Sequence, residues 1–179
     1  METEDDPALW IASCEGREDD VRELLAEEVD IDERGGAHES SSLQIASLHG
    51  YEEIVVLLLE HGADVAARTG VSGWTSLMVA AHRGHEAVVH ILIDNGADLL
   101  SKNSAGRTAE ELATDGHQHE IAAMLRAEIE RRQAEAERRE ALRRAQCEAF
   151  AMGHQERLGA GSRVRELDAG VVQMVLECV

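Results

Sequence analysis

The chain has 179 residues, of which 44% are hydrophobic but only 2% aromatic, so its core should be aliphatic and rich in alanine. The formal net charge of -19 would repel nucleic-acid phosphates, so we expect no nucleic-acid partner. The acidity gathers in residues 1–33, where Arg17 and Arg22 are the only basic residues. This segment is either a solvated surface or a face that attracts a basic partner.

Three cysteines, Cys14, Cys147 and Cys178, lie far apart and form no CxxC pair. Their spacing argues against a disulfide framework and for a reducing compartment. The N-terminus lacks the basic and apolar regions of a signal peptide, and no apolar run is long enough to span a membrane. We therefore expect a cytoplasmic or nuclear protein that is not secreted and has no membrane partner.

Glycines recur at a nearly constant spacing along the first 130 residues. Gly50 follows Gly16 by 34 residues, Gly84 follows by another 34, and Gly116 by 32. An aliphatic pattern of helical period follows each glycine, so each copy predicts two short helices that turn at a glycine with positive φ. We place the copies at residues 6–37, 38–71, 72–104 and 105–130.

Polar residues mark the expected helix ends. Asp6 with Pro7 predicts the start of the first helix. The first helices of the later copies should be N-capped by Ser41, Thr75 and Thr108, and Thr108 has Glu111 at the spacing of a capping box. Gly62 and Gly96 stand just past the last apolar turn of their helices, where glycines favour helix termination.

The third copy, Gly73-Trp74-Thr75-Ser76-Leu77-Met78-Val79-Ala80-Ala81-His82-Arg83-Gly84-His85, resembles the ankyrin repeat. That family repeats a β-turn and two antiparallel helices, with a Thr-Pro-Leu-His start and a Gly-His turn. The resemblance covers about residues 5–130 and implies an all-α solenoid of stacked helix-turn-helix units with β-turn loops. The Pro and His of the start motif are missing from every copy, which implies a less rigid turn.

A charged helix is expected to extend the repeats over residues 126–150. It contains no Gly or Pro and pairs Glu with Arg at i,i+4 in Glu128–Arg132, Glu135–Arg139 and Glu140–Arg144. Glycines from Gly153 should end it, and a short apolar helix starting near Asp168 should follow within residues 151–179. That helix could dock on the repeats, on the long helix or on a partner, and its start is faintly similar to an F-box.

Catalytic and metal-binding patterns are missing from the sequence. His82 and His85 flank an inter-helix turn, and His117 and His119 would point apart on a helix. The single lysine, Lys102, excludes a P-loop, and no Gly-x-Ser-x-Gly elbow occurs. We therefore predict a non-catalytic protein without cofactor or metal, and we expect no small-molecule ligand.

The resemblance implies contact positions on the concave face and turn tips of the stack. They lie just before the start motif and just before the inter-helix glycine: Ser40, Trp74, Arg107, Cys14, Glu15, Leu48, His49, His82 and Arg83. Trp74 stands out because Trp is a frequent hot-spot residue, although it could instead pack over the neighbouring turn. A non-catalytic adaptor that binds another protein is the leading hypothesis. The alternatives are a structural subunit anchored by its C-terminal helices, an F-box-like ubiquitin-ligase adaptor and an acidic regulator of an enzyme.

Overall fold

The computed structural model describes residues 6–27 and 29–158, with only the helical backbone described from 148 onward. The chain divides into two compact units at Ala127. The predicted apolar C-terminal helix lies outside the described residues. Among the described residues, no helix is both long and apolar enough to cross a membrane.

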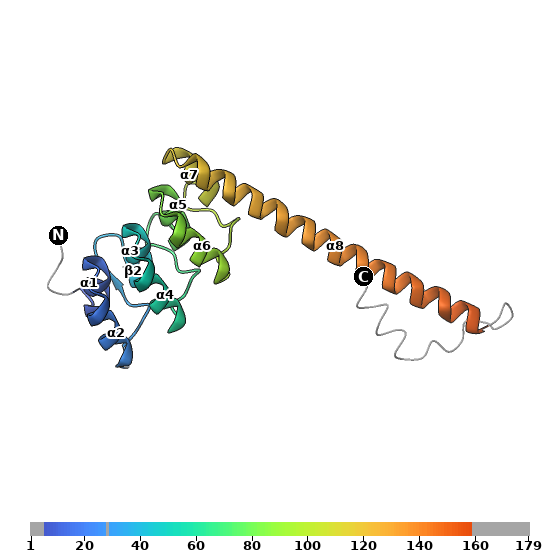
Figure 1. The fold of residues 1–179 in the computed structure, drawn as a ribbon, viewed down its shortest axis with the longest axis horizontal. Coiled ribbons are helices and arrows are strands. Elements are labelled where there is room, and N and C mark those ends of the chain that lie inside the picture. The colour runs from blue at the N-terminus through green and yellow to red at the C-terminus, as the bar shows by residue number, and fades with distance from the viewer. Residues whose placement is uncertain (1–5, 28, 159–179) are drawn as a thin grey trace. The chain divides into compact units, whose positions relative to one another are not determined.

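The first unit is built from helical hairpins (Figure 1). The first helices of the hairpins are α1 (Ala8–Glu15), α3 (Ser42–His49), α5 (Ser76–Arg83) and α7 (Ala109–Asp115). The second helices are α2 (Glu18–Ala26), α4 (Glu52–Glu60), α6 (Glu86–Asp94) and the start of α8 (His119–Leu158). Two-residue strands, β1 (Arg34–Gly35) and β2 (Ser40–Ser41), pair antiparallel before α3. The fold is all-α, as the repeat pattern predicted.

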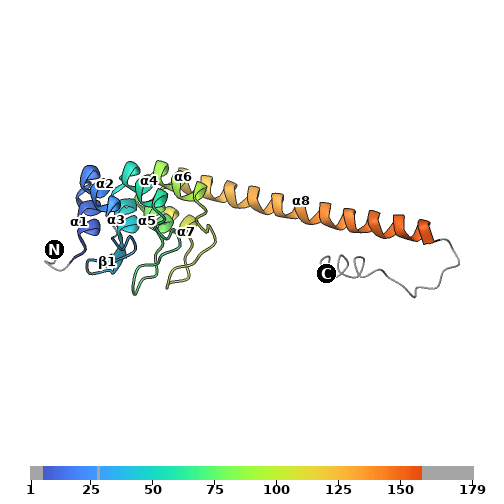
Figure 2. The ribbon, with the colours of Figure 1, turned by 90° about the horizontal axis from the view of Figure 1, so that it is seen from below.

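The hairpins stack so that like helices are neighbours. Each first helix packs on the next, from α1 through α3 and α5 to α7, and α4 contacts both α2 and α6. Figure 2 shows the two layers, with the connecting loops extending from the side of the first helices. Leu43, Leu58, Leu77 and Leu92 are fully buried between the layers. The apolar stripes of the sequence thus form one shared aliphatic core.

The inter-helix glycines end their first helices in the left-handed conformation, as predicted. Gly50 has a φ of 78° and is covered by the next repeat, where a Cβ added to Gly50 would lie 2.5 Å from Nδ1 of His85. Tyr51 covers Gly16 in the same way, and Gln118 covers Gly84. Any side chain at Gly50 would therefore meet both an unfavourable φ and the ring above it.

The fourth turn differs from the prediction. Gly116 has a φ of -75°, and the left-handed residue is His117, with a φ of 61°. The turn is therefore 33 residues after Gly84, so the fourth copy is one residue shorter than the others rather than two, as the glycine spacing suggested. Gly116 is needed for another reason, because a Cβ there would lie 2.2 Å from the carbonyl oxygen of His82.

Helix caps agree with the sequence except at the first helix. Ser41 forms a capping box with Gln44, Thr75 accepts from the Met78 amide, and Thr108 forms the predicted capping box with Glu111. Asp6 does not cap α1, whose N-cap is Pro7 without a side-chain bond. The Asp6 Oδ1 instead accepts a hydrogen bond from the Gly36 amide at 2.8 Å, so it braces the first loop.

Helix α8 is longer than expected, because it continues through Gly153 to Leu158. Two predicted ion pairs are present, Glu128–Arg132 at 2.8 Å and Glu140–Arg144 at 2.5 Å. Glu135 pairs with Arg131 at 2.5 Å rather than with Arg139. The contacts with Arg131 and Arg132 lower the pKa of Glu128 to about 2, with the hydrogen bond from Arg131 as the main cause.

The cysteines only partly match the expectation from their spacing. Cys14 is half-buried near the end of α1 and is not disulfide-bonded. Cys147 is disulfide-bonded, although the cysteine spacing argued against a disulfide framework.

Candidate partner-binding site

The predicted contact positions before the inter-helix glycines fall at the ends of neighbouring first helices. The last two residues of α1, α3 and α5 are Cys14 and Glu15, Leu48 and His49, and His82 and Arg83, and their equivalents in the fourth hairpin are Asp115 and Gly116. Because the first helices pack side by side, these positions form a row across the stack. We call this set the helix-end row.

Trp74 is half-buried and is held firmly at the base of its loop. Its amide donates to the Thr69 Oγ1 at 2.9 Å, and its carbonyl accepts from the Thr69 amide at 2.9 Å and from Gln44 Nε2 at 3.1 Å. The indole ring meets the ring of His82 edge to face, with centroids 5.4 Å apart. The structure therefore brings Trp74 to the helix-end row in a fixed orientation.

The two tryptophans differ in whether the indole N–H has an acceptor. Trp10 is buried, and its Nε1 donates to the Ser40 Oγ at 3.1 Å. Ser40 is itself buried, so this predicted contact position is placed inside the first loop rather than on the surface. No described residue accepts a hydrogen bond from the Nε1 of Trp74.

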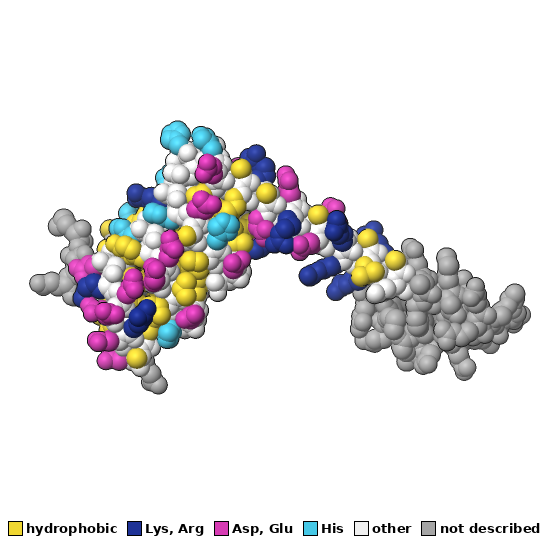
Figure 3. All heavy atoms as spheres, viewed as in Figure 1, with side chains coloured by type: hydrophobic (Ala, Val, Ile, Leu, Met, Phe, Trp, Pro, Cys, Tyr) yellow, Lys and Arg dark blue, Asp and Glu magenta, His cyan; other side chains and the backbone are white. Residues whose placement is uncertain are grey.

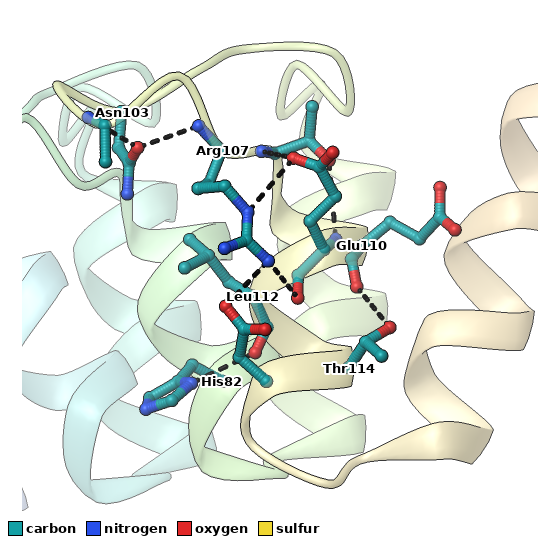
Figure 4. A network of polar contacts seen from close by, with 10 residues as sticks. His82, Asn103, Arg107, Glu110, Leu112 and Thr114 are labelled. Atoms are coloured by element: carbon teal, nitrogen blue, oxygen red, sulfur yellow. Dashed lines mark hydrogen bonds and ion pairs between the residues drawn. The ribbon is translucent and has the colours of Figure 1, made fainter.

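Arg107 repeats the relation of Trp74 to His82 one hairpin later. It precedes the N-cap of α7 as Trp74 precedes that of α5, and its Nη2 lies 2.7 Å from Oδ2 of Asp115, the equivalent of His82. Figure 4 shows this ion pair together with the contact of His82 Nδ1 to the Leu112 carbonyl oxygen, 3.0 Å long. The Trp74 ring and the Leu112 carbonyl oxygen thus both orient the His82 ring.

Charges along the helix-end row are unevenly compensated. Glu15 pairs with Arg17 at 2.5 Å, and Asp115 pairs with Arg107. Arg83 is exposed, and no described carboxylate forms an ion pair with it. The row therefore carries one uncompensated positive charge, in a chain whose net charge is -19.

His49 is the neighbour of Arg83 in the row. Its ring stacks on Tyr51 with centroids 5.5 Å apart. Partial burial is the main cause that lowers the pKa of His49. Electrostatic interactions with Arg83 and then with His85 lower this pKa further. His85 in turn fixes the end of α3, because its Nε2 contacts the Leu48 carbonyl oxygen at 3.0 Å.

The loop tips add a residue that the sequence analysis did not select. Val71 is 97% exposed at the tip before α5. Its loop is tied on both sides, since the Gly70 amide donates to the His38 carbonyl at 3.1 Å and the Ser104 hydroxyl to the Val71 carbonyl at 2.8 Å. A lone valine in a loop gives no sequence signal, because its exposure depends on how the tips pack.

The described surface carries acidic and basic side chains on different hairpins. Among the described residues, no group of three His, Cys, Asp or Glu side chains is placed to hold a metal ion. Figure 3 shows acidic side chains gathered over α1 and α2. Trp74 and Arg83, which has no described ion-pair partner, lie on the third hairpin, two hairpins away from α1 and α2.

These stacked hairpins, each with a two-helix unit and a projecting loop, define a helical-repeat solenoid. Residues 43–92 match the family model described as ankyrin repeats (many copies), which covers the helices α3 to α6. This central part of the chain is therefore similar to ankyrin repeats. No curated protein matches it. Ankyrin repeats are generally protein–protein interaction modules.

Proposed function

We propose that the chain is a non-catalytic adaptor that binds a partner protein through the helix-end row and the loop tips. The observation that carries the proposal is Trp74, a large aromatic side chain that is half-exposed although its backbone is fixed by three hydrogen bonds. Binding by a fixed side chain loses little conformational entropy, which favours affinity. Arg83, at the end of α5, supplies a charge, and the exposed Val71, in the loop before α5, supplies an apolar surface.

The test uses the full chain to capture partners, which mass spectrometry identifies, followed by affinity measurement with the main one. The double substitution Trp74→Ala with Arg83→Ala should weaken binding at least about tenfold, equivalent to about 1.4 kcal/mol. A matched control carries Val56→Ala and Arg22→Ala, both exposed on second helices. If the affinity is unchanged while circular dichroism shows a folded stack, the proposed surface is wrong.

A subunit anchored by its C-terminal part is the competing function. The second unit begins at Glu128, so a chain ending at Ala127 removes it as a whole. An adaptor retains its main partner after this truncation, whereas an anchored subunit loses it.

An acidic regulator would instead use the face over α1 and α2, where Glu18, Asp19 and Glu23 are exposed. Because exposed charges are screened by salt, its affinity for a basic partner would fall steeply between low and physiological ionic strength. Charge reversal at Glu18 and Glu23 would abolish that dependence. Binding through Trp74 would survive the same reversal.

A further inference from the structure

This inference concerns the charge of the segment that the helix-end row binds, and it rests on the proposed function. We propose that the row recognises an acidic segment of the partner, with an Asp or Glu carboxylate paired to Arg83 and an acceptor oxygen bound by the Trp74 indole N–H.

The charge argument starts from compensation within the chain. Both carboxylates of the row already have a cation, since Glu15 contacts Arg17 and Asp115 contacts Arg107. A basic partner segment would have to compete with those arginines. Arg83 lies between these pairs, on the third of four hairpins, and has no described carboxylate partner. A carboxylate of the partner can form a charge-assisted, bidentate contact with Arg83 without breaking an existing ion pair.

Trp74 and His49 add polar groups that fit the same ligand. The Nε1 of Trp74 has no described acceptor, in contrast to the Nε1 of Trp10. The exposed ring of His49 adds a further polar group on the neighbouring helix. A carboxylate and the carbonyl oxygens of an extended segment are acceptors, so they match this set of donors.

The chain's net charge does not contradict an acidic ligand. At physiological ionic strength the Debye length is about 8 Å, so acidic residues of α2 act weakly on a ligand two hairpins away. A contact pair with Arg83 is screened far less. Long-range repulsion should slow association at low salt, so the association rate for an acidic segment should rise with ionic strength.

The experiment selects 12-residue peptides from a random phage-displayed library on the full chain, and then measures synthetic copies by fluorescence polarisation. The selected peptides should be enriched in Asp and Glu relative to the starting library. Arg83→Glu should weaken their binding at least tenfold, and so should changing the critical carboxylate of the peptide to its amide. A peptide with Lys at that position should bind Arg83→Glu better than it binds the original chain.

Arg22→Glu is the matched control, because it makes the same change in net charge at an exposed site on α2. It should leave the affinity within about twofold, and Arg83→Gln should lie between the original chain and Arg83→Glu. Melting curves of each variant exclude unfolding as the cause.

Three results overturn the proposal. Selected peptides that respond to Trp74→Ala but not to Arg83→Glu would refute the acidic ligand while the binding surface stands. Peptides that respond to neither would refute the proposed function as well. A selection that enriches no peptide, or enriches basic ones, also counts against a row built for an acidic segment.

Discussion

Trp74 and His82 meet ring to ring at an interplanar angle of 84°, although one precedes α5 and the other lies near its end. Arg107 and Asp115 occupy the same two positions in the next hairpin and form an ion pair. The same backbone geometry thus brings together an aromatic pair in one repeat and a charged pair in the next. The stack fixes which positions meet, and the side chains decide what kind of contact they make.

The aromatic pair should be measurable as a coupling energy. In a double-mutant cycle with Trp74→Ala and His82→Ala, we expect a coupling of about 0.5–1.5 kcal/mol in the free energy of unfolding. Loss of the His82 contact to Leu112 cancels because it occurs in both arms of the cycle. Urea unfolding gives the values, and the non-contacting pair Trp74 and Glu86 should show coupling near zero.

Ser76→Pro should stabilise the protein. Ser76 is fully buried at the start of α5, its hydroxyl has no hydrogen-bond partner, and Thr75 before it is extended, with φ -91° and ψ 165°. A proline at the first helical position restricts the unfolded chain, and the change removes an unsatisfied polar group, for a gain of about 1 kcal/mol. Thermal unfolding measures the gain. Ser76→Ala separates the two effects, and a lower melting temperature for the proline variant would contradict the assignment.

Gly50→Ala should destabilise the stack more than Gly62→Ala. Both glycines have positive φ, but only Gly50 is covered, because nothing lies within 4 Å of a Cβ at Gly62. The left-handed backbone alone costs alanine about 1–2 kcal/mol, and displacement of the His85 ring adds about 1–3 kcal/mol at Gly50. Chemical denaturation of both variants gives the difference. Equal losses would mean that the ring moves aside freely.

In the fourth turn, a substitution to glycine should stabilise the protein. His117 is the left-handed residue there, so His117→Gly should stabilise the protein by about 0.5–1 kcal/mol. Gly116→Ala should be strongly destabilising, because its Cβ would collide with the His82 carbonyl. Calorimetric unfolding of the two variants should therefore give shifts of opposite sign. Shifts of the same sign would show that the turn is at Gly116 after all.

The pKa of His49 should lie below 6.5, the ordinary value for histidine, and should rise in Arg83→Gln. It should stay below that value, because the lost solvation is the larger cause. With the folded-state pKa lowered, the unfolded chain binds more protons, so this residue makes stability fall as pH drops below the unfolded value. NMR titration of the His49 ring protons tests both points, and an unchanged pKa in Arg83→Gln would show that the two side chains are too far apart to interact.

Much of the fold follows from local pattern. Ser41, Thr75 and Thr108 begin their helices as the capping preferences predict, and the glycines at 16, 50 and 84 form the turns. The predictions that the structure corrects involve contacts between repeats. Asp6 binds an amide 30 residues away instead of capping α1, and Gly116 is required by a carbonyl of the preceding hairpin. A periodic pattern cannot reveal such pairs, because it describes each repeat alone.

The candidate site shows the same division. Family spacing placed Trp74 beside His82, and the structure brings them into contact. Family spacing could not show that Ser40 is buried and hydrogen-bonded to Trp10. It also could not show that Arg107 forms an ion pair with Asp115 while Arg83 has no described ion-pair partner. These differences arise from which side chains meet across hairpins, and they decide the charge that a partner encounters.

The loop tips are joined in series. His38 accepts from the Gly70 amide, and Ser72 and Lys102 link the next two loops through the Ser104 amide and the Arg68 guanidinium. Each tip is therefore tied to its neighbour by backbone bonds, with side-chain bonds from Arg68 and Ser104 in addition. A new specificity could be introduced by exchanging other residues of a tip, whereas inserting or deleting even one residue would shift the backbone groups that join adjoining loops.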